Sequence, residues 1–288
     1  MFVLLPGKRE ESDHYQLLQE EVALATGRRL GLTIEVAYAP AFDQLRVLKK
    51  RLLEGGGVDA AIMEPSSLST MDLILRELRG RTGLILLNTW APSVEEAARG
   101  WGNLPFGTIS THHGELGRLQ GRQVQSMLPD GGTALCVAGP QRSSAAQERL
   151  EGLRASLGAS IELLDIAAGE WTEAAGSAAF GDWYRVFKAR NQVVSVIAAQ
   201  SDELAIGVRN AIEGLAEPDH KEALQRAKLL GMDACPAYGQ RLVNEGALTA
   251  SIVNPAATGP ALEALAGFWR EGRAVPLRSY TEARPYPD

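Results

Sequence analysis

The chain has 288 residues, of which 45% are hydrophobic and 22% charged, and its formal net charge at pH 7 is −6. That length exceeds a typical single hydrophobic core, so we expect one large domain or two medium-sized ones. The acidic balance, with no basic run longer than residues 49–51, argues against a surface that binds nucleic acid.

The first third of the chain alternates between short apolar runs and amphipathic helical patterns. We expect helices at 13–29, 42–53 and 66–79, and strands at 2–5, 33–38, 58–63 and 83–87. The glycines at 55–57 end the second helix. Proline and glycine interrupt the segment 88–106, which predicts a loop with at most a short helix over 94–99.

The same alternation resumes after residue 107. Strands are expected at 108–110, 133–138, 161–166, 227–231 and 250–253, and helices at 115–128, 144–157, 171–189, 236–245 and 258–271. Between them, the segment 193–212 reads as a buried strand that leads directly into a helix. The pattern predicts βαβ units and parallel sheets, and about ten strands fit two doubly wound lobes better than one sheet.

The strand-to-helix junction at residues 200–203 is the clearest candidate for a binding position. Either Ser201 or Asp202 can cap the new helix, and ligands of open α/β sheets bind where strands end. Other expected strand ends also carry amides, hydroxyls, carboxylates and aromatic rings. This mixture suits a polyhydroxylated ligand, because planar polar groups bind hydroxyls and an aromatic face covers a sugar ring.

Five motifs in a fixed order carry a resemblance to a known family. They are GELGRLQG at 114–121, SSAAQERLEGL at 143–153, AAQSDELAIGVRNAI at 198–212, LLGMDACPAYG at 229–239 and GALTASIVNPAATG at 246–259. With them the chain resembles the type I periplasmic binding proteins, in the sugar-binding group that includes ribose-binding protein and is related to the effector domains of LacI-type repressors.

The resemblance implies an α/β fold with two doubly wound parallel-sheet lobes joined by a three-stranded hinge. The N-terminal lobe would comprise residues 1–109 and 255–279, and the C-terminal lobe residues 110–254 and 280–288. A small polar ligand, a sugar or sugar derivative, would bind in a cleft between the lobes, and hinge closure would trap it.

The resemblance also implies ligand-binding positions, of which several depart from the ribose binder. Asn88 and Thr89 replace an acidic and a basic residue, Gln147 replaces an arginine, Ser201 replaces an asparagine, and Asn254 replaces a glutamine. The departures at positions 88, 89 and 147 remove charged hydrogen bonds, so the site is not expected to copy a ribose site. The expected ligand-binding residues are Ser12, His14, Tyr15, Asn88, Thr89, Trp90, His112, Gln147, Arg149, Trp171, Ser201, Asp202, Asp233 and Asn254.

Several of these residues have a structural alternative. Trp171 could stack on a sugar or simply pack at a helix start, and Asp233 could contact the ligand or cap a turn. His112 and His113 with Glu115 could suggest a metal, but adjacent strand residues point opposite ways and no third ligand stands at suitable spacing. A role for His112 in lining a cleft or hinge is favoured.

Catalytic and cofactor motifs are not found in the sequence. It contains no GxSxG elbow, no phosphate-binding GxxxxGK[ST] and no GxGxxG after a strand, so we predict no enzyme activity, no metal and no cofactor. The two cysteines, Cys136 and Cys235, form no CxxC motif, and the sequence leaves open whether they pair.

The resulting hypothesis is the solute-binding protein of an ABC-type uptake system, whose closed form a membrane permease or a signalling receptor recognises. No apolar stretch approaches the roughly 20 residues that cross a bilayer. The first apolar run is too short for a signal peptide, so a periplasmic location presumes that a secretion signal was removed. The alternative is the ligand-sensing effector domain of a transcriptional regulator or sensor kinase, cytoplasmic if it is regulatory.

Overall fold

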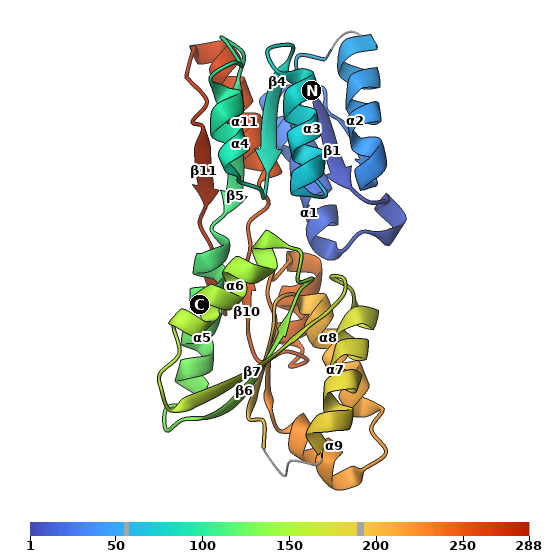
Figure 1. Cartoon of the computed structure of the whole chain (residues 1–288), viewed down its shortest axis with the longest axis vertical. Helices are drawn as coiled ribbons and strands as arrows, with labels where there is room; N and C mark the ends of the chain where they lie inside the picture. Colours follow the sequence, from blue (N-terminus) through green and yellow to red (C-terminus); the bar gives the residue numbers. More distant parts are fainter. Residues whose placement is uncertain (55–57, 189–192, 288) are drawn as a thin grey trace. The chain divides into compact units, whose positions relative to one another are not determined.

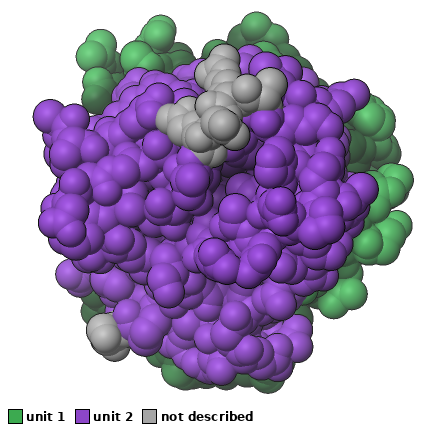
Figure 2. All heavy atoms as spheres, turned by 90° about the horizontal axis from the view of Figure 1, so that it is seen from below, with its two compact units in different colours: residues 1–111, 256–281 green, residues 112–255, 282–288 purple. Residues whose placement is uncertain are grey.

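The computed structural model describes residues 1–54, 58–188 and 193–287. The chain divides into two compact units, which Figure 2 colours separately. Unit 1 comprises residues 1–111 and 256–281, and unit 2 comprises residues 112–255 and 282–288. The chain therefore passes from one unit to the other three times, after residues 111, 255 and 281.

Unit 1 is built on a parallel sheet of six strands in the order β11-β5-β4-β3-β1-β2 (Figure 1). The strands are β1 (Phe2–Pro6), β2 (Glu35–Ala39), β3 (Ala60–Met63), β4 (Gly83–Leu87), β5 (Phe106–Thr111) and β11 (Arg278–Thr281). Side chains of a strand alternate between the two faces of a sheet. Phe2 and Leu4 accordingly join one hydrophobic cluster, and Val3 and Leu5 join another.

Helices cover both faces of this sheet, which is why its central strands are apolar throughout. Apolar side chains of α2 (Ala41–Lys49), α3 (Leu68–Leu78) and α4 (Pro92–Ala98) pack against one face. Those of α1 (His14–Leu30) and α11 (Thr258–Glu271) pack against the other. A short 3₁₀ helix at Arg9–Glu11 connects β1 to α1.

Unit 2 repeats the plan with a smaller parallel sheet in the order β7-β6-β8-β9. Its strands are β6 (Gly132–Ala138), β7 (Ile161–Ala167), β8 (Val196–Ala199) and β9 (Lys228–Leu230). Helices α5 (His113–Met127) and α6 (Ser144–Ala155) cover one face, and α7 (Glu173–Phe187) and α8 (Asp202–Glu213) lie on the other side of the sheet in Figure 1. The short strands β10 (Ser251–Val253) and β12 (Arg284–Tyr286) pair antiparallel beside this sheet.

The expected fold class is confirmed: the chain forms two lobes, each a doubly wound parallel sheet. Some elements differ from the sequence prediction. The short helix α4 begins two residues earlier than expected, and α9 (Pro218–Gln225), β11 and β12 were not predicted. The expected helix at 236–245 is a π-helical turn, Pro236–Gln240, followed by α10 (Arg241–Asn244). The glycines at 55–57 and the end of the helix expected to reach residue 189 lie outside the described residues.

Among the described residues, no helix combines the length and hydropathy that crossing a bilayer requires. Cys136 and Cys235 are both buried, and no disulfide joins them.

Candidate functional site

Unit 1 places a group of polar side chains at the carboxyl ends of β3 and β4. Glu64 follows β3 and Asn88 follows β4, while Tyr15 and Gln16 stand in the first turn of α1. Glu64 Oε2 accepts hydrogen bonds from Gln16 Nε2 and from Asn88 Nδ2, both at 3.1 Å. The Asn88 amide also lies 3.3 Å from the Tyr15 hydroxyl, which accepts from Gln19 Nε2 at 3.1 Å. We call these five residues the unit 1 cluster.

Buried amides fix the backbone behind this cluster. Gln44 Nε2 donates to the Glu64 carbonyl at 2.9 Å, and Gln44 Oε1 accepts from Ser66 N at 3.0 Å. Gln19 Oε1 accepts from the backbone N of Thr258, at the start of α11. Asn88 itself has a φ of +50°, a conformation that asparagine tolerates better than most residues. The cluster is thus held on both sides by the packed sheet and helices.

The other expected residues of unit 1 contact different groups. Ser12 Oγ donates to the Lys8 carbonyl within the loop after β1. Thr89 Oγ1 donates to Met71 Sδ at 3.6 Å. His14, the first residue of α1, is half-buried.

Trp90 also turns away from the unit 1 cluster. Its ring packs against the hydrophobic cluster under α3 and lies 4.4 Å from the Arg278 guanidinium carbon. Of the six residues expected in unit 1, the structure therefore brings Tyr15 and Asn88 together. Glu64, Gln16 and Gln19 complete their group, although they are not among the expected ligand-binding residues.

Unit 2 gathers four of the expected residues, and we call them the unit 2 cluster: Arg149, Trp171, Asp233 and Asn254. Asp233 Oδ1 accepts from Asn254 Nδ2 at 2.9 Å and lies 3.6 Å from Arg149 Nη2. The guanidinium carbon of Arg149 lies 5.3 Å from the centre of the Trp171 ring. Arg149 is only 6% exposed, and its Nε has no hydrogen-bond partner in the structure. A buried cation, a carboxylate, an amide and an aromatic face therefore stand together.

Gln200 belongs to the predicted junction at residues 200–203 but is not among the expected ligand-binding residues, and it links the segments that carry the unit 2 cluster. It is fully buried; its Oε1 accepts from Gly139 N and its Nε2 donates to the Ala146 carbonyl, both at 3.0 Å. Its own carbonyl accepts from Arg149 Nη1 at 2.7 Å. One amide side chain thus ties the loop after β6 to α6, and its backbone orients the guanidinium.

Glycine at position 139 is required by the indole of Trp171. A Cβ at this position would lie 2.1 Å from the ring, far inside van der Waals contact. Trp171 is half-buried and precedes α7, which Thr172 caps by accepting from Ala175 N. Because the ring rests on bare backbone, its position depends on the glycine.

Ser201 and Asp202 have separate roles at the junction of β8 and α8. Ser201 is the N-cap: its hydroxyl accepts from Leu204 N at 3.1 Å. Asp202 is 1% exposed; its Oδ2 accepts from Ala234 N at 2.8 Å and its Oδ1 from the Ser251 hydroxyl at 2.7 Å. Both residues lie at the strand end as expected, with their side chains bonded to the protein.

The two remaining expected residues, His112 and Gln147, form hydrogen bonds with other groups. His112 is exposed and caps α5, with its Nδ1 accepting from Glu115 N at 3.3 Å. Gln147 is exposed on α6, and its amide donates to the Gln141 carbonyl at 2.7 Å.

Burial sets the electrostatics of the unit 2 carboxyls. Burial raises the pKa of Asp233, while the Arg149 charge and the Asn254 hydrogen bond act in the opposite direction. Burial also raises the pKa of Asp202 well above its ordinary value, and the neighbouring Asp233 charge adds to the shift. In both carboxyls, therefore, burial favours the protonated form over the charged form.

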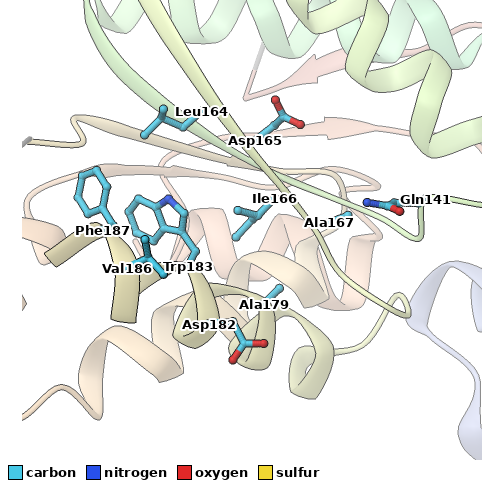
Figure 3. Close-up of a pocket in the computed structure, with 10 residues that line it drawn as sticks. All are labelled: Gln141, Leu164, Asp165, Ile166, Ala167, Ala179, Asp182, Trp183, Val186 and Phe187. Atoms are coloured by element: carbon cyan, nitrogen blue, oxygen red, sulfur yellow. The ribbon is translucent and has the colours of Figure 1, made fainter. Parts of the chain in front are cut away.

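Two hollows, one in each unit, are lined by residues other than those of the two clusters. A groove of about 470 Å³ in unit 2 runs between β7 and α7, with the rings of Trp183 and Phe187 on one side and Ile166 on the other (Figure 3). Its two carboxylates, Asp165 and Asp182, form ion pairs with neighbouring arginines. A second hollow, of about 600 Å³ in unit 1, is lined by seven residues: Arg9, Glu10, Ser12, Leu17, Glu20, Glu21 and Leu24. Ser12 is the one expected site residue among the residues lining either hollow.

Within the described ranges, no three His, Cys, Asp or Glu side chains are arranged to hold a metal ion. The pair at 112–113 therefore has no third ligand beside it in that part of the chain.

Residues 101–262 match the model of a family described as periplasmic binding protein domain, and this region includes the whole unit 2 cluster. The chain belongs to the periplasmic binding protein family. Members of this family are solute-binding proteins. No curated protein sequence matches the chain.

Solved structures of periplasmic binding proteins share the fold over nearly the entire chain. The solute-binding protein from Actinobacillus succinogenes with bound D-allose has a TM-score of 0.82 at 16% identity, covering 99% of this chain and 96% of its own. The arabinose-transporter component from Shewanella sp. ANA-3 has a TM-score of 0.78 at 18% identity, covering 99% and 91%. A fructose-binding periplasmic domain of a hybrid two-component system has a TM-score of 0.78 at 19% identity, covering 99% and 89%.

The TM-scores of these comparisons establish the common fold of a periplasmic binding protein. The expected resemblance to the sugar-binding group of type I is thereby confirmed at the level of family and fold. The chemistry of this member's site must be argued from its own side chains.

Proposed function

We propose that this periplasmic binding protein binds a small polyhydroxylated ligand, a sugar or sugar derivative. The observation that carries the proposal is the unit 2 cluster: a buried Arg149, Asp233 and Asn254 beside the half-buried ring of Trp171. A guanidinium donates to hydroxyl oxygens and a carboxylate accepts from hydroxyl hydrogens. An indole face covers the apolar side of a pyranose or furanose ring.

The unit 1 cluster supports the same ligand class. Tyr15 supplies a hydroxyl, Gln16 and Asn88 supply amides, and Glu64 supplies a carboxylate. Each of these groups bonds hydroxyls, and none provides the basic residues that a phosphate or a dicarboxylate would require. We propose, in line with the family resemblance, that one ligand takes hydrogen bonds from both clusters and that hinge closure traps it.

The preferred biological role is delivery of the ligand to the membrane permease of an ABC-type uptake system, in the periplasm. Two of the similar structures are named as components of ABC transporters, for arabinose and with bound D-allose. The second candidate is a ligand sensor. A structure with the same fold, the fructose-binding periplasmic domain of a hybrid two-component system, supports this second candidate.

Ligand binding can be tested by thermal unfolding against a fixed panel: L-arabinose, D-allose, D-fructose, D-galactose and myo-inositol. A ligand that binds the native state alone stabilises it by RT ln(1 + [L]/Kd), about 2.7 kcal/mol at a hundredfold excess over Kd. We expect at least one panel member to raise the melting temperature in wild type and to raise it by a smaller amount in Trp171→Ala. Binding of none of them, tested alongside a broader set of polyols, would contradict the proposed ligand class.

Transport and sensing are separated in cells that lack the gene. A transport role predicts that uptake of the radiolabelled sugar falls while induction of sugar-responsive genes by internal sugar persists. A sensing role predicts the reverse. Fractionation with an antibody against the chain tests the periplasmic location.

A further inference from the structure

Asp202 lies under the loop that carries Asp233, and its carboxylate contacts that loop directly. Its Oδ2 accepts from Ala234 N at 2.8 Å, one residue beyond Asp233. Its Oδ1 accepts from the Ser251 hydroxyl at 2.7 Å, at the start of β10. With 1% of its surface exposed, Asp202 is in no position to reach solvent from this arrangement.

The loop it contacts has an unusual backbone. Asp233 has a φ of +95° and Ala234 a φ of +40°, the left-handed region that side chains other than glycine rarely adopt. Two consecutive residues of this kind carry conformational strain, which persists only where the surroundings hold the backbone in place. The strained turn directs the Asp233 side chain to Asn254 and Arg149.

Two glycines leave the space that Asp202 occupies. A Cβ at position 231 would lie 2.1 Å from Asp202 Oδ1, and a Cβ at position 239 would lie 1.9 Å from Oδ2. Neither glycine has a positive φ, so the carboxylate itself explains why these positions are glycine. The loop is therefore folded closely around this one side chain.

We infer that Asp202 is a positioning residue for ligand binding: by holding Ala234 N and Ser251 it keeps the strained 231–234 loop in the conformation that presents Asp233. The inference rests on the proposed function, in which Asp233 contacts the ligand. In this role Asp202 does not contact the ligand itself. It acts through the loop backbone, so its effect on affinity disappears when residue 233 no longer contacts the ligand.

The first test is a double-mutant cycle on affinity, measured with the panel sugar that wild type binds most tightly. Asp202→Ala is expected to weaken binding by about tenfold or more, the effect of losing a buried hydrogen bond to an acidic group. In an Asp233→Ala background, where position 233 has no polar side chain to present, the same substitution should change affinity by less than about threefold, because coupled residues are non-additive. Equal losses in both backgrounds would overturn the inference.

Two further variants separate positioning from general loss of stability. Asp202→Asn keeps an oxygen for Ala234 N and an amide that can donate to the Ser251 hydroxyl, so it should lose less affinity than Asp202→Ala. Leu224→Ala, in the buried face of α9, destabilises unit 2 without touching the loop and should leave affinity unchanged. If Asp202→Ala does not fold, Asp202→Ser replaces it, because its shorter side chain cannot reach both donors.

The second test needs no ligand and therefore stands even if every panel sugar fails to bind. Hydrogen exchange of the sugar-free protein should be at least about tenfold faster at the Ala234 amide in Asp202→Ala than in wild type, and little changed there in Leu224→Ala. Unchanged exchange at Ala234 would refute the positioning role. The expected faster exchange at Ala234 in Asp202→Ala, combined with no binding of any sugar, would instead refute the proposed function alone.

Discussion

Replacing Asp233 by asparagine should weaken sugar binding strongly while changing stability little. Asp233 Oδ1 accepts from Asn254 and faces Arg149 at 3.6 Å. Asparagine has nearly the same shape and keeps one acceptor oxygen, but it removes the negative charge. On the proposed function, that charge strengthens the hydrogen bonds accepted from ligand hydroxyls.

The size of each effect follows from the surroundings of the carboxyl. A hydrogen bond to a charged group contributes about 1.5 to 3 kcal/mol, which corresponds to a roughly 10- to 150-fold loss of affinity. For folding, two contributions oppose each other: Arg149 loses its opposite charge, and burial no longer penalises an ionised group at position 233. We therefore expect the unfolding free energy to change by less than about 2 kcal/mol.

Isothermal titration calorimetry with the tightest-binding panel sugar measures the first effect, and urea denaturation measures the second. Asp165→Asn is the matched control, because Asp165 belongs to the same unit but is exposed and paired with Arg154. Its affinity should stay within about twofold of wild type, as expected for an exposed ion pair. If Asp233→Asn binds the sugar as tightly as the control does, Asp233 does not contact the ligand and the reasoning fails.

Three other outcomes are expected. Trp171→Ala should lower sugar affinity by roughly 2- to 12-fold and remove the ligand-induced change in tryptophan fluorescence; Trp269→Ala, at an exposed site in unit 1, should alter neither. Because burial raises the pKa of Asp202, the native state keeps its proton at pH values where the unfolded chain has lost it. The stability of wild type relative to Asp202→Asn, from urea curves at pH 4 to 8, should therefore fall as pH rises above about 4, and a rise would contradict the assignment. Burial raises the pKa of Cys136 to about 12, so a thiol reagent at pH 8 should label it only after unfolding, and rapid labelling of native protein would contradict its burial.

The sequence predicted the fold because its signals are local and repeated. Buried strands such as β4 and β6 read as continuous apolar runs, and each is followed by a helix pattern. The elements it missed lack that signal. Helix α9 buries only Leu224, and β11 is a four-residue strand whose side chains are exposed or half-exposed. Pairing with β5, more than 160 residues away, is what makes β11 a strand.

The candidate site was predictable in position but not in side-chain direction. The rule that ligands bind at strand carboxyl ends located Asn88, Asp233 and Asn254. It could not show that Thr89 turns to Met71 or that Trp90 packs under Arg278, because these directions depend on tertiary contacts. The sequence prediction missed the buried amides of Gln19, Gln44 and Gln200 for the same reason.

Gln200 illustrates that limit. It follows β8 directly, at the junction singled out from the sequence, yet nothing in its spacing distinguishes a buried link from an exposed loop residue. Its role becomes visible only when Gly139, Ala146 and Arg149 are brought to it by three different segments. All of these partners are distant in sequence, so no local sequence pattern predicts that Gln200 is buried and hydrogen-bonded.

Backbone strain and the proposed site coincide in both units. Among the described residues, the non-glycine residues with positive φ are Asn88, Asp233 and Ala234. Asn88 belongs to the unit 1 cluster, Asp233 to the unit 2 cluster, and Ala234 is the residue whose amide Asp202 holds. Strained conformations cost free energy and survive where the fold over-determines them, which happens most often at sites that must orient a group for a ligand. The positive-φ residues other than glycine thus belong to the two clusters or adjoin them, which supports the proposal that both clusters orient polar groups for a ligand.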